Sequence, residues 1–444
     1  MVRNIAKYSL GFQLLIWVVK PFYRLFYRRL KVVGRENIPR NVPIIFIANH
    51  QNSLMDALSI IYATGNRQIV FLARADIFKQ KLVARLLYFI KIMPVYRLRD
   101  GMENMSQNDG TFELVKPVLE SRRAIGIFPE GTQSEKYQLK IFKKGLCRIA
   151  FPLEELSNFQ LNTTIVPVGL AYSDWYSRNA DLLINIGKPI KLSDYAELYK
   201  QNQPKAYSEF MQVCETAVSS LTWNIRTNDF YDTTIAATTI YLNEQKRKNK
   251  LQQRFAIQQR IAISIAKQER NDVTPLKLLQ EKITKYAETL SQKKLSDKAM
   301  RKNKNIVFHF LALLFGLICL LPFSLIGLIT NGLPYVVAST ISRKVKDKGF
   351  ITTFNFALWF LLSAIYYPLL FCAIGFLFGW LNSLFSFPVI IFCGLLTFLV
   401  NQWFQRLLIK WQQFKTHIFA KNKNKEIVAQ HAEIIKNIEN LMNQ

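Results

Sequence analysis

The chain has 444 residues, too many for one ordinary hydrophobic core, and half of them are hydrophobic. A formal net charge of +29 and a pI near 9.9 call for an anionic partner, either nucleic acid or an anionic membrane, and the hydrophobic share favours the membrane. Five scattered cysteines without disulfide-like spacing exclude a disulfide-stapled secreted domain and favour a reducing compartment.

The N-terminal region carries an apolar run from Leu10 to Val19 that is too short to cross a bilayer alone. It continues into a mixed aromatic and basic stretch that ends at Arg29. This pattern is typical of an amphipathic helix lying in the membrane interface, so we predict an interfacial anchor over residues 1–30. The run lacks a small-residue cleavage site, and we do not expect a signal peptide.

The run from Pro43 to Ala48 has the length and β-branched content of a buried strand. It leads directly to His50, and Asp56 follows in the same short stretch. Catalytic groups concentrate where strands of an open α/β sheet end, so this pair suits a base and the carboxylate that orients it. The alternative is a structural histidine before a helix cap, because Ser53 and Asp56 resemble a capping box.

Two cations are candidates for binding an anionic group such as a phosphate. Arg97 ends a strand-like segment that begins at Ile92, and its guanidinium is well shaped to hold a phosphate. Lys143 follows another strand-like run, residues 124–128, by 15 positions. Both could instead be ordinary solvated charges of a basic protein.

A third strand-like run, residues 124–128, leads into a loop over residues 129–134. This loop brings together a carboxylate, a glycine that permits unusual backbone angles, and hydroxyl groups. The candidate residues in it are Glu130, Gly131 and Thr132.

Cys147 could in principle act as a nucleophile, but Leu146 and Ile149 flank it at helix-like spacing, so we predict a buried structural cysteine. The run from Ile165 to Gly169 supplies a further strand. No nucleophile elbow, phosphate-binding glycine and lysine loop, dinucleotide fingerprint or Cys-x-x-Cys pair occurs, and we expect no metal.

Residues 204–305 are rich in Gln, Lys, Ala and Ile, which predicts a basic spacer of solvated amphipathic helices. A partner-binding role and a coiled coil stay open, although no clean run of heptads is present. The region carries no recognisable motif.

Residues 306–406 form the predicted membrane region, with three apolar segments that each approach the length of about 20 residues needed to cross a bilayer. They run from Ile306 to about Leu333, from Phe354 to Leu381 and from Phe385 to Phe404. Pro322 and the pair Asn331–Gly332 interrupt the first segment, which suggests a hairpin that dips and returns. The later two segments would cross and return through a turn near Asn382–Ser383.

The flanks of these segments are basic, which places them on the cytoplasmic side by the positive-inside rule. They include residues 301–304, the connector with Arg343, Lys344, Lys346 and Lys348, and the tail over residues 407–444.

Four of these motif blocks, taken together, resemble the glycerolipid acyltransferases, the family of lysophosphatidate and glycerol-phosphate acyltransferases. The blocks are His50 with Asp56, Arg97, Phe128 to Gly131, and Val166 to Val168, and the resemblance covers roughly residues 30 to 190. Two departures stand out. Five residues separate His50 from Asp56 where the commonest pattern has four, which resembles a branch that includes eukaryotic glycerol-phosphate and dihydroxyacetone-phosphate acyltransferases. Lys91 stands where a glycine often precedes the arginine block.

The resemblance implies an α/β acyltransferase domain over residues 31–203, in which His50 is the catalytic base and Asp56 orients it. Neutral imidazole can take the proton of an attacking hydroxyl, and a carboxylate can fix its tautomer. Glu130 and Gly131 would belong to the acceptor-binding loop, with the carboxylate available to a glycerol hydroxyl. The acyl donor would be acyl-coenzyme A or acyl-acyl-carrier protein, with no cofactor.

We therefore expect an integral membrane enzyme of phospholipid biosynthesis, with its catalytic domain on the cytoplasmic face. It would move a fatty acyl group from a thioester to the hydroxyl of 1-acylglycerol 3-phosphate, forming phosphatidic acid. Glycerol 3-phosphate or dihydroxyacetone phosphate is the alternative acceptor. A non-enzymatic basic membrane scaffold and a pseudoenzyme with altered motif spacing are further alternatives. Anionic lipids and acyl-carrier protein are the candidate partners, and nucleic acid is not.

Overall fold

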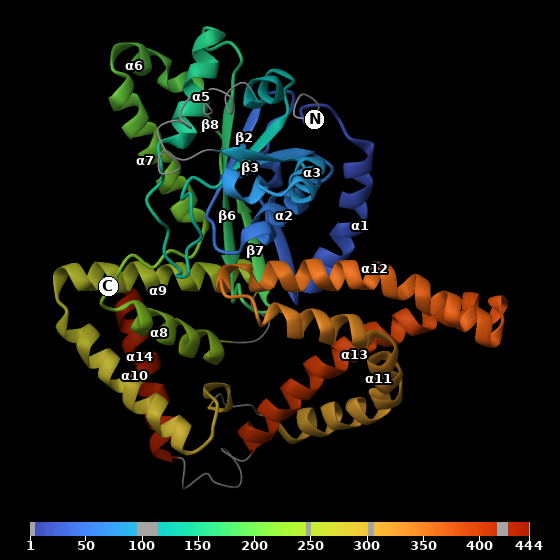
Figure 1. The fold of residues 1–444 in the computed structure, drawn as a ribbon. Coiled ribbons are helices and arrows are strands. Elements are labelled where there is room, and N and C mark those ends of the chain that lie inside the picture. The colour runs from blue at the N-terminus through green and yellow to red at the C-terminus, as the bar shows by residue number, and fades with distance from the viewer. Residues whose placement is uncertain (1–4, 96–113, 246–249, 301–305, 415–424, 444) are drawn as a thin grey trace. The chain divides into compact units, whose positions relative to one another are not determined.

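The computed structural model describes residues 5–95, 114–245, 250–300, 306–414 and 425–443 (Figure 1). The chain divides into two compact units. The first contains residues 1–224 together with a short later segment, residues 345–356, and the second contains residues 225–344 and 357–444. Each unit has its own architecture.

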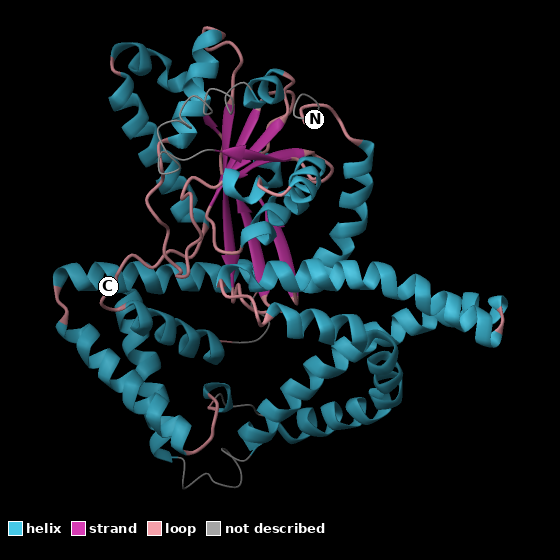
Figure 2. Cartoon of the chain, in the orientation of Figure 1, coloured by secondary structure: helices cyan, strands magenta, loops and turns pink. Residues whose placement is uncertain are grey.

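The first unit is built on one sheet, which has eight strands among the described residues and the order β1-β7-β6-β2-β5-β3-β4, with β8 paired to β6 (Figure 2). The pairs of β6 with β7 and with β8 are antiparallel, and the others are parallel. The strands are β1 (Arg29–Val33), β2 (Ile44–Ala48), β3 (Ile69–Arg74), β4 (Ile92–Val95), β5 (Ala124–Ile127), β6 (Thr164–Tyr172), β7 (Asp181–Ile186) and β8 (Ile190–Lys191).

The central strands are continuous apolar runs, as expected for parallel strands that are covered on both faces. Every residue of β2 and of β5 is buried. The two strands pair in parallel, with Ile44 opposite Ala124 and Ile47 opposite Ile127, so the loops that follow them leave the sheet side by side. The predicted strands near residues 43–48, 92–97, 124–128 and 165–169 correspond, over the described residues, to β2, β4, β5 and β6.

Helices cover both faces of this sheet (Figure 1). They are α1 (Leu10–Phe26), α2 (Ser53–Ala63), α3 (Lys81–Phe89), α5 (Gly145–Leu156), α6 (Ala196–Gln201) and α7 (Gln203–Leu221), with short 3-10 helices η2 (Arg35–Asn37), η3 (Ala75–Phe78), η6 (Leu192–Tyr195) and η8 (Lys348–Phe350). The sequence places the start of the spacer at residue 204. The compact unit instead extends to Asn224, because Phe210, Cys214 and Val218 of α7 pack into the core beneath the sheet.

The second unit contains a helical bundle with its own hydrophobic core. It consists of α8 (Tyr231–Glu244), α9 (Leu251–Asn271), α10 (Thr274–Gln292), η7 (Asp297–Ala299) and α14 (Lys425–Asn443). Ile427, Ile434 and Ile438 of α14 lie on one helical face and join the same core as residues of α9 and α10. The region predicted as a solvated spacer and the predicted tail therefore fold together.

Three helices, which belong to the second unit apart from the first residues of the middle helix, are long and apolar enough to cross a membrane, by length and composition. They are α11 (Ile306–Ser342), α12 (Ile351–Phe378) and α13 (Trp380–Phe414), and they match the three predicted apolar segments. The turn between the last two lies at Gly379, whose φ of 92° suits glycine, and not at Asn382–Ser383, which already belong to α13.

Helix α11 stays helical where the sequence suggested interruptions at Pro322 and at Asn331–Gly332. It packs antiparallel along α13, from Phe310 against Trp411 to the Asn331 side chain, whose Nδ2 donates to the carbonyl of Ile390 at 3.1 Å. Neighbouring helices and polar side chains can satisfy the backbone groups that proline frees, so prolines bend such helices without ending them. Figure 1 draws α11 as strongly curved. The return crossing of a hairpin stays a prediction.

Candidate active site

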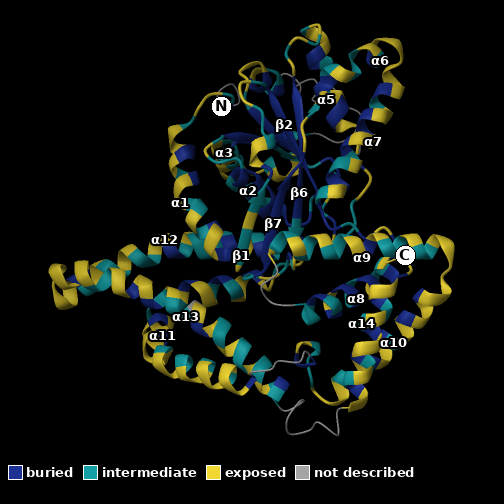
Figure 3. Cartoon of the chain, turned by 180° about the vertical axis from the view of Figure 1, so that it is seen from behind, coloured by how far each residue is buried: buried dark blue, intermediate teal, exposed yellow. Residues whose placement is uncertain are grey.

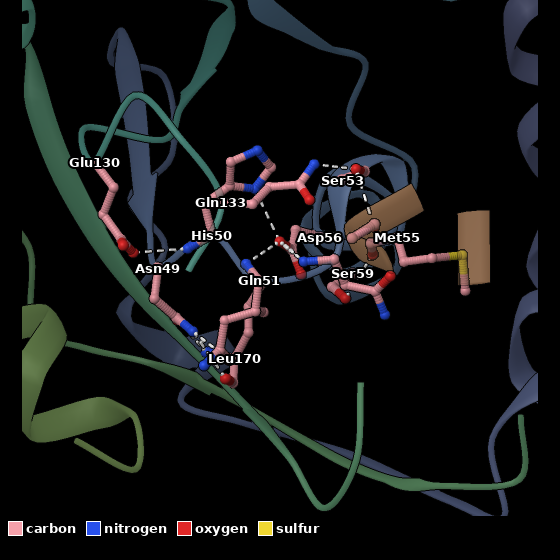
Figure 4. A network of polar contacts seen from close by, with 12 residues as sticks. Asn49, His50, Gln51, Ser53, Met55, Asp56, Ser59, Glu130, Gln133 and Leu170 are labelled. Carbon is pink, nitrogen blue, oxygen red and sulfur yellow. Dashed lines mark hydrogen bonds and ion pairs between the residues drawn. The ribbon is translucent and has the colours of Figure 1, made fainter. Parts of the chain in front are cut away.

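His50 and Asp56 meet at the end of the central strand β2. His50 lies in the loop after Ala48, and Asp56 lies in the first turn of α2. Nδ1 of His50 is 2.9 Å from Oδ2 of Asp56, and the exposed fraction is 18% for the histidine side chain and 0% for the aspartate side chain (Figure 4). An ionised carboxylate only accepts hydrogen bonds, so Nδ1 carries the proton and Nε2 is the nitrogen left for a substrate hydroxyl.

The carboxylate of Asp56 is held by three further donors. Its Oδ2 accepts hydrogen bonds from the backbone N–H groups of Gln51 at 2.8 Å and Asn52 at 2.7 Å. Its Oδ1 accepts one from the hydroxyl of Tyr172 at 2.7 Å. Helix α2 begins at Ser53 with Asn52 as its N-cap, so the capping box with Ser53 as the cap does not form. The aspartate is thus fixed in the orientation that binds the histidine.

Tyr172 was not a candidate from the sequence. It ends strand β6, which is the neighbour of β2 in the sheet, and it lies 116 positions from Asp56. Its hydroxyl is also 3.2 Å from Oγ of Ser59 in α2. Only the order of strands in the sheet brings these residues together, and a sequence carries no local signal for that order.

The loop after β5 holds the backbone of His50 on both sides. Oε1 of Glu130 accepts a hydrogen bond from the His50 N–H at 2.8 Å, and the His50 carbonyl accepts one from the Ser134 N–H at 2.7 Å. The ring of Phe128 stacks on the imidazole with a centroid separation of 4.2 Å. The two motif loops therefore act as one structural element around the histidine.

Glu130 is almost fully buried, with 1% of its surface exposed. Its second oxygen, Oε2, accepts a hydrogen bond from the backbone N–H of Lys140 at 3.2 Å. Burial raises the pKa of Glu130 to about 8, although these two N–H groups act in the opposite direction. The observed contacts of Glu130 hold the His50 loop, and its binding of an acceptor hydroxyl stays a prediction.

Gly131 and the cations beside it shape the outer side of this loop. Gly131 has a φ of 69°, and its N–H donates to the carbonyl of Phe128 at 3.0 Å, which closes a tight turn. The side chain of Lys143 covers the glycine, with Cδ 3.1 Å from where a Cβ would stand. Thr132 is exposed, and its Oγ1 accepts a hydrogen bond from Nζ of Lys140 at 3.2 Å. Lys140 is a cation that the sequence reasoning missed.

Arg97 lies outside the described residues. Strand β4, which precedes it, pairs in parallel with β3, and β3 pairs in parallel with β5. The carboxyl end of β4 therefore points to the same edge of the sheet as the His50 loop. Lys91, just before β4, has a φ of 60°, a conformation that glycine adopts readily, and its Nζ donates to the carbonyls of Ile5 at 2.8 Å and Lys7 at 2.7 Å.

Cys147 is buried in α5, and burial raises the pKa of its thiol to about 12, which disfavours a nucleophilic thiolate. Within the part of the chain that the structure describes, no group of three or more His, Cys, Asp or Glu residues could hold a metal ion. The arrangement around His50 suits transfer of a proton from a hydroxyl, with cations available for an anionic substrate.

Comparison with known proteins agrees with this geometry. A family model described as Acyltransferase matches residues 29–171. The chain is 30% identical over 171 residues to the 1-acyl-sn-glycerol-3-phosphate acyltransferase of Borreliella burgdorferi, a match that covers 38% of this chain and 60% of that protein. It is 33% identical over 124 residues to the Saccharomyces cerevisiae protein of the same name, covering 27% of this chain and 38% of that protein.

Residues 29–171 match the acyltransferase family.

The acyltransferase domain contains His50, Asp56 and the loop that carries Glu130. A further similar protein is the glycerol-3-phosphate O-acyltransferase 2 of Saccharomyces cerevisiae, 26% identical over 135 residues, which cover 30% of this chain and 18% of that protein. The chain thus spans 60% or less of the length of these curated relatives. Among solved structures, the 1-acyl-sn-glycerophosphate acyltransferase PlsC of Thermotoga maritima matches with a TM-score of 0.32 and 18% identity, over 49% of this chain and 88% of that chain.

Proposed function

We propose that this protein is a membrane-bound 1-acylglycerol-3-phosphate O-acyltransferase that forms phosphatidic acid. The observation that carries the proposal is the His50 and Asp56 pair, fixed by its hydrogen bonds at the end of β2 and partly open to solvent through the histidine. The acyltransferase family of residues 29–171 supplies the reaction class. A basic scaffold without chemistry would not need this pair.

The proposed reaction is one acyl transfer. Nε2 of His50 takes the proton of the acceptor hydroxyl while the oxygen attacks the carbonyl carbon of the thioester. The new C–O bond forms, the tetrahedral intermediate collapses as the C–S bond breaks, and the leaving sulfur receives the proton from His50. Asp56 stabilises the imidazolium that exists between these steps. Acyl-coenzyme A or acyl-acyl-carrier protein supplies the acyl group, and no cofactor takes part.

Binding of the acceptor phosphate requires cations near the loop after β5. Lys143 lies over Gly131, and Lys140 contacts Thr132 beside it. We propose that Lys143 and Arg97 bind the acceptor phosphate, with Thr132 and Gly131 lining its site. Cationic groups near a phosphate are stabilising, and more so where water is excluded.

Glycerol 3-phosphate is the second candidate acceptor. The five residues between His50 and Asp56 favour it, and so does the similarity to the yeast protein named glycerol-3-phosphate O-acyltransferase 2. More of the similar curated proteins are named for 1-acylglycerol 3-phosphate, which places that acceptor first.

Membrane attachment follows from the three apolar helices, and α1 adds an interfacial surface. One side of α1 is buried through Phe12, Ile16 and Tyr23, whereas Leu14 and Trp17 are exposed (Figure 3). We propose that this exposed side lies in the headgroup layer and that the catalytic unit is cytoplasmic. The basic connector supports this orientation, because residues 345–356 belong to the same compact unit as His50.

The acceptor is tested with the purified full-length chain in vesicles, using labelled acyl-coenzyme A and acyl-acyl-carrier protein as donors. Lysophosphatidate and glycerol 3-phosphate are offered in parallel. The proposal predicts labelled phosphatidic acid from lysophosphatidate with at least one donor. Product from glycerol 3-phosphate alone would select the second candidate. A folded protein that acylates neither acceptor would contradict both.

A further inference from the structure

The short connector between the apolar helices α11 and α12 is part of the catalytic unit. Residues 345–356 group with residues 1–224, although nearly 300 positions separate the connector from the His50 loop. The connector contains η8 and the first residues of α12. Asp347 shapes it, because its Oδ1 accepts a hydrogen bond from the Gly349 N–H at 2.9 Å.

The first contact of the connector is with the residue that begins α2. Gly349 is buried, and its carbonyl accepts a hydrogen bond from Oγ of Ser53 at 3.2 Å. The amide of Gln133, from the loop after β5, donates to the same Oγ (Figure 4). A methyl group on Gly349 would collide with Oε1 of Gln133. Ser53 is thus held between the connector and the second motif loop.

Two further contacts join the connector to the loop after β6 and to α1. Oγ1 of Thr352 donates to the carbonyl of Trp175 at 2.7 Å, and Nδ2 of Asn52 donates to that same carbonyl at 2.9 Å. The ring of Phe356 packs edge-on against Tyr23 and Phe26 of α1, with centroid separations of 6.1 and 5.5 Å.

The held residues are those that orient the catalytic carboxylate. Ser53 has a φ of 41°, in the left-handed region that a non-glycine residue occupies only when its surroundings enforce it. Asn52, directly before it, donates its backbone N–H to Asp56 at 2.7 Å. A change at Ser53 therefore reaches Asp56, and through it the imidazole of His50.

We infer that residues 345–356 are a positioning segment of the acyltransferase site, which keeps the turn at Asn52 and Ser53 in the conformation that orients Asp56 toward His50. This rests on the proposed function. The loop between two membrane helices thereby contributes to catalysis although it supplies no reacting group.

A double-mutant cycle on Gly349 and Gln133 tests this inference in the full-length chain. G349A displaces the Gln133 amide and so disturbs Ser53, and Q133A removes that amide directly. Each variant should lower kcat about 5- to 20-fold with little change in KM for lysophosphatidate, because orientation of the base matters mainly in the transition state. Adding G349A to Q133A should lower kcat by less than about a further twofold, because Q133A has already removed the atom with which the methyl group introduced by G349A would collide.

Gly332→Ala in α11 is the matched control, because the nearest atom its methyl would meet is Cδ1 of Leu328 at 3.5 Å. It should leave kcat unchanged. An inactive wild type would contradict the proposed function itself. An active wild type with G349A unchanged would overturn only the inference about the connector. Multiplicative losses in the double variant, together with lower melting temperatures in all variants, would also overturn it, because they indicate general destabilisation.

Discussion

At the residue scale, the site depends on a buried carboxylate whose donors come from two separate segments, the loop after β2 and the end of β6. Backbone N–H groups of Gln51 and Asn52 and the hydroxyl of Tyr172 bind Asp56 alongside His50. A buried acceptor that loses one donor keeps the cost of its desolvation, so each contact matters for the orientation of the pair. The sequence showed the local pair but not the distant tyrosine.

Tyr172→Phe should lower kcat about 3- to 10-fold with little change in KM, because it removes one hydrogen bond to Asp56. Tyr23→Phe is the matched control, because the Tyr23 hydroxyl is also buried but bonds to the carbonyl of Met55 and to Oγ of Ser59 instead of to the carboxylate. Steady-state kinetics of the two variants, with melting temperatures, make the comparison. Equal kcat losses in both would contradict a specific role for Tyr172.

The raised pKa of Glu130 should make the free energy of unfolding depend on pH. Its pKa is about 8 in the folded protein and near 4.5 as the ordinary value, so between these values the folded protein holds more protons than the unfolded chain. The free energy of unfolding should therefore fall as pH rises from about 5 to about 8. Glu130→Gln removes this contribution. Its melting temperature should vary less over this range than that of the wild type, by a few degrees.

Thermal unfolding of both proteins at pH 5 and pH 8 in the same detergent measures the effect of Glu130. The difference between the two proteins isolates this one group from the others that titrate. Identical pH dependence in wild type and E130Q would show that the Glu130 carboxyl is ionised at neutral pH in the folded protein.

At the element scale, most strands near the site could be predicted because β2, β4, β5 and β6 are short continuous apolar runs. The motif loops directly follow β2 and β5, and their parallel pairing makes them neighbours. The packing of α7 and α14 into hydrophobic cores could not be predicted in the same way. Both are amphipathic with many polar residues, and what their apolar faces cover depends on packing across the fold. The Gly349 contact joins residues 296 positions apart, so it has no local sequence signal either.

If the exposed apolar side of α1 lies in the membrane interface, it should affect how a membrane-bound substrate enters the site. Leu14→Glu combined with Trp17→Glu should lower the rate with long-chain lysophosphatidate in vesicles about tenfold or more, because charged side chains oppose contact with the lipid interface. The rate with a short-chain, water-soluble lysophosphatidate should change little. Leu156→Glu, at an exposed leucine of α5, is the control. An equal loss with both substrates would contradict an interfacial role for α1.

At the scale of the whole molecule, the chain consists of an α/β acyltransferase unit and a helical unit with three apolar helices. The connector between α11 and α12, residues 345–356, belongs to the acyltransferase unit. Hydropathy and charge predicted the apolar helices well, because length and composition are local properties. The division into units follows from long-range packing. The helical bundle is an example. From the sequence we predicted a solvated spacer and a separate tail, whereas α14 shares one hydrophobic core with α9 and α10.

The role of His50 is tested by measuring phosphatidic acid formation from lysophosphatidate by wild type, His50→Ala and His309→Ala, each purified at full length in vesicles. His309 belongs to α11, outside the acyltransferase domain. We expect H50A to lose about 10²- to 10⁴-fold in rate while its membrane association and melting temperature are kept, and H309A to retain the wild-type rate. An H50A protein that is folded and as active as the wild type would contradict the central claim that His50 is the catalytic base.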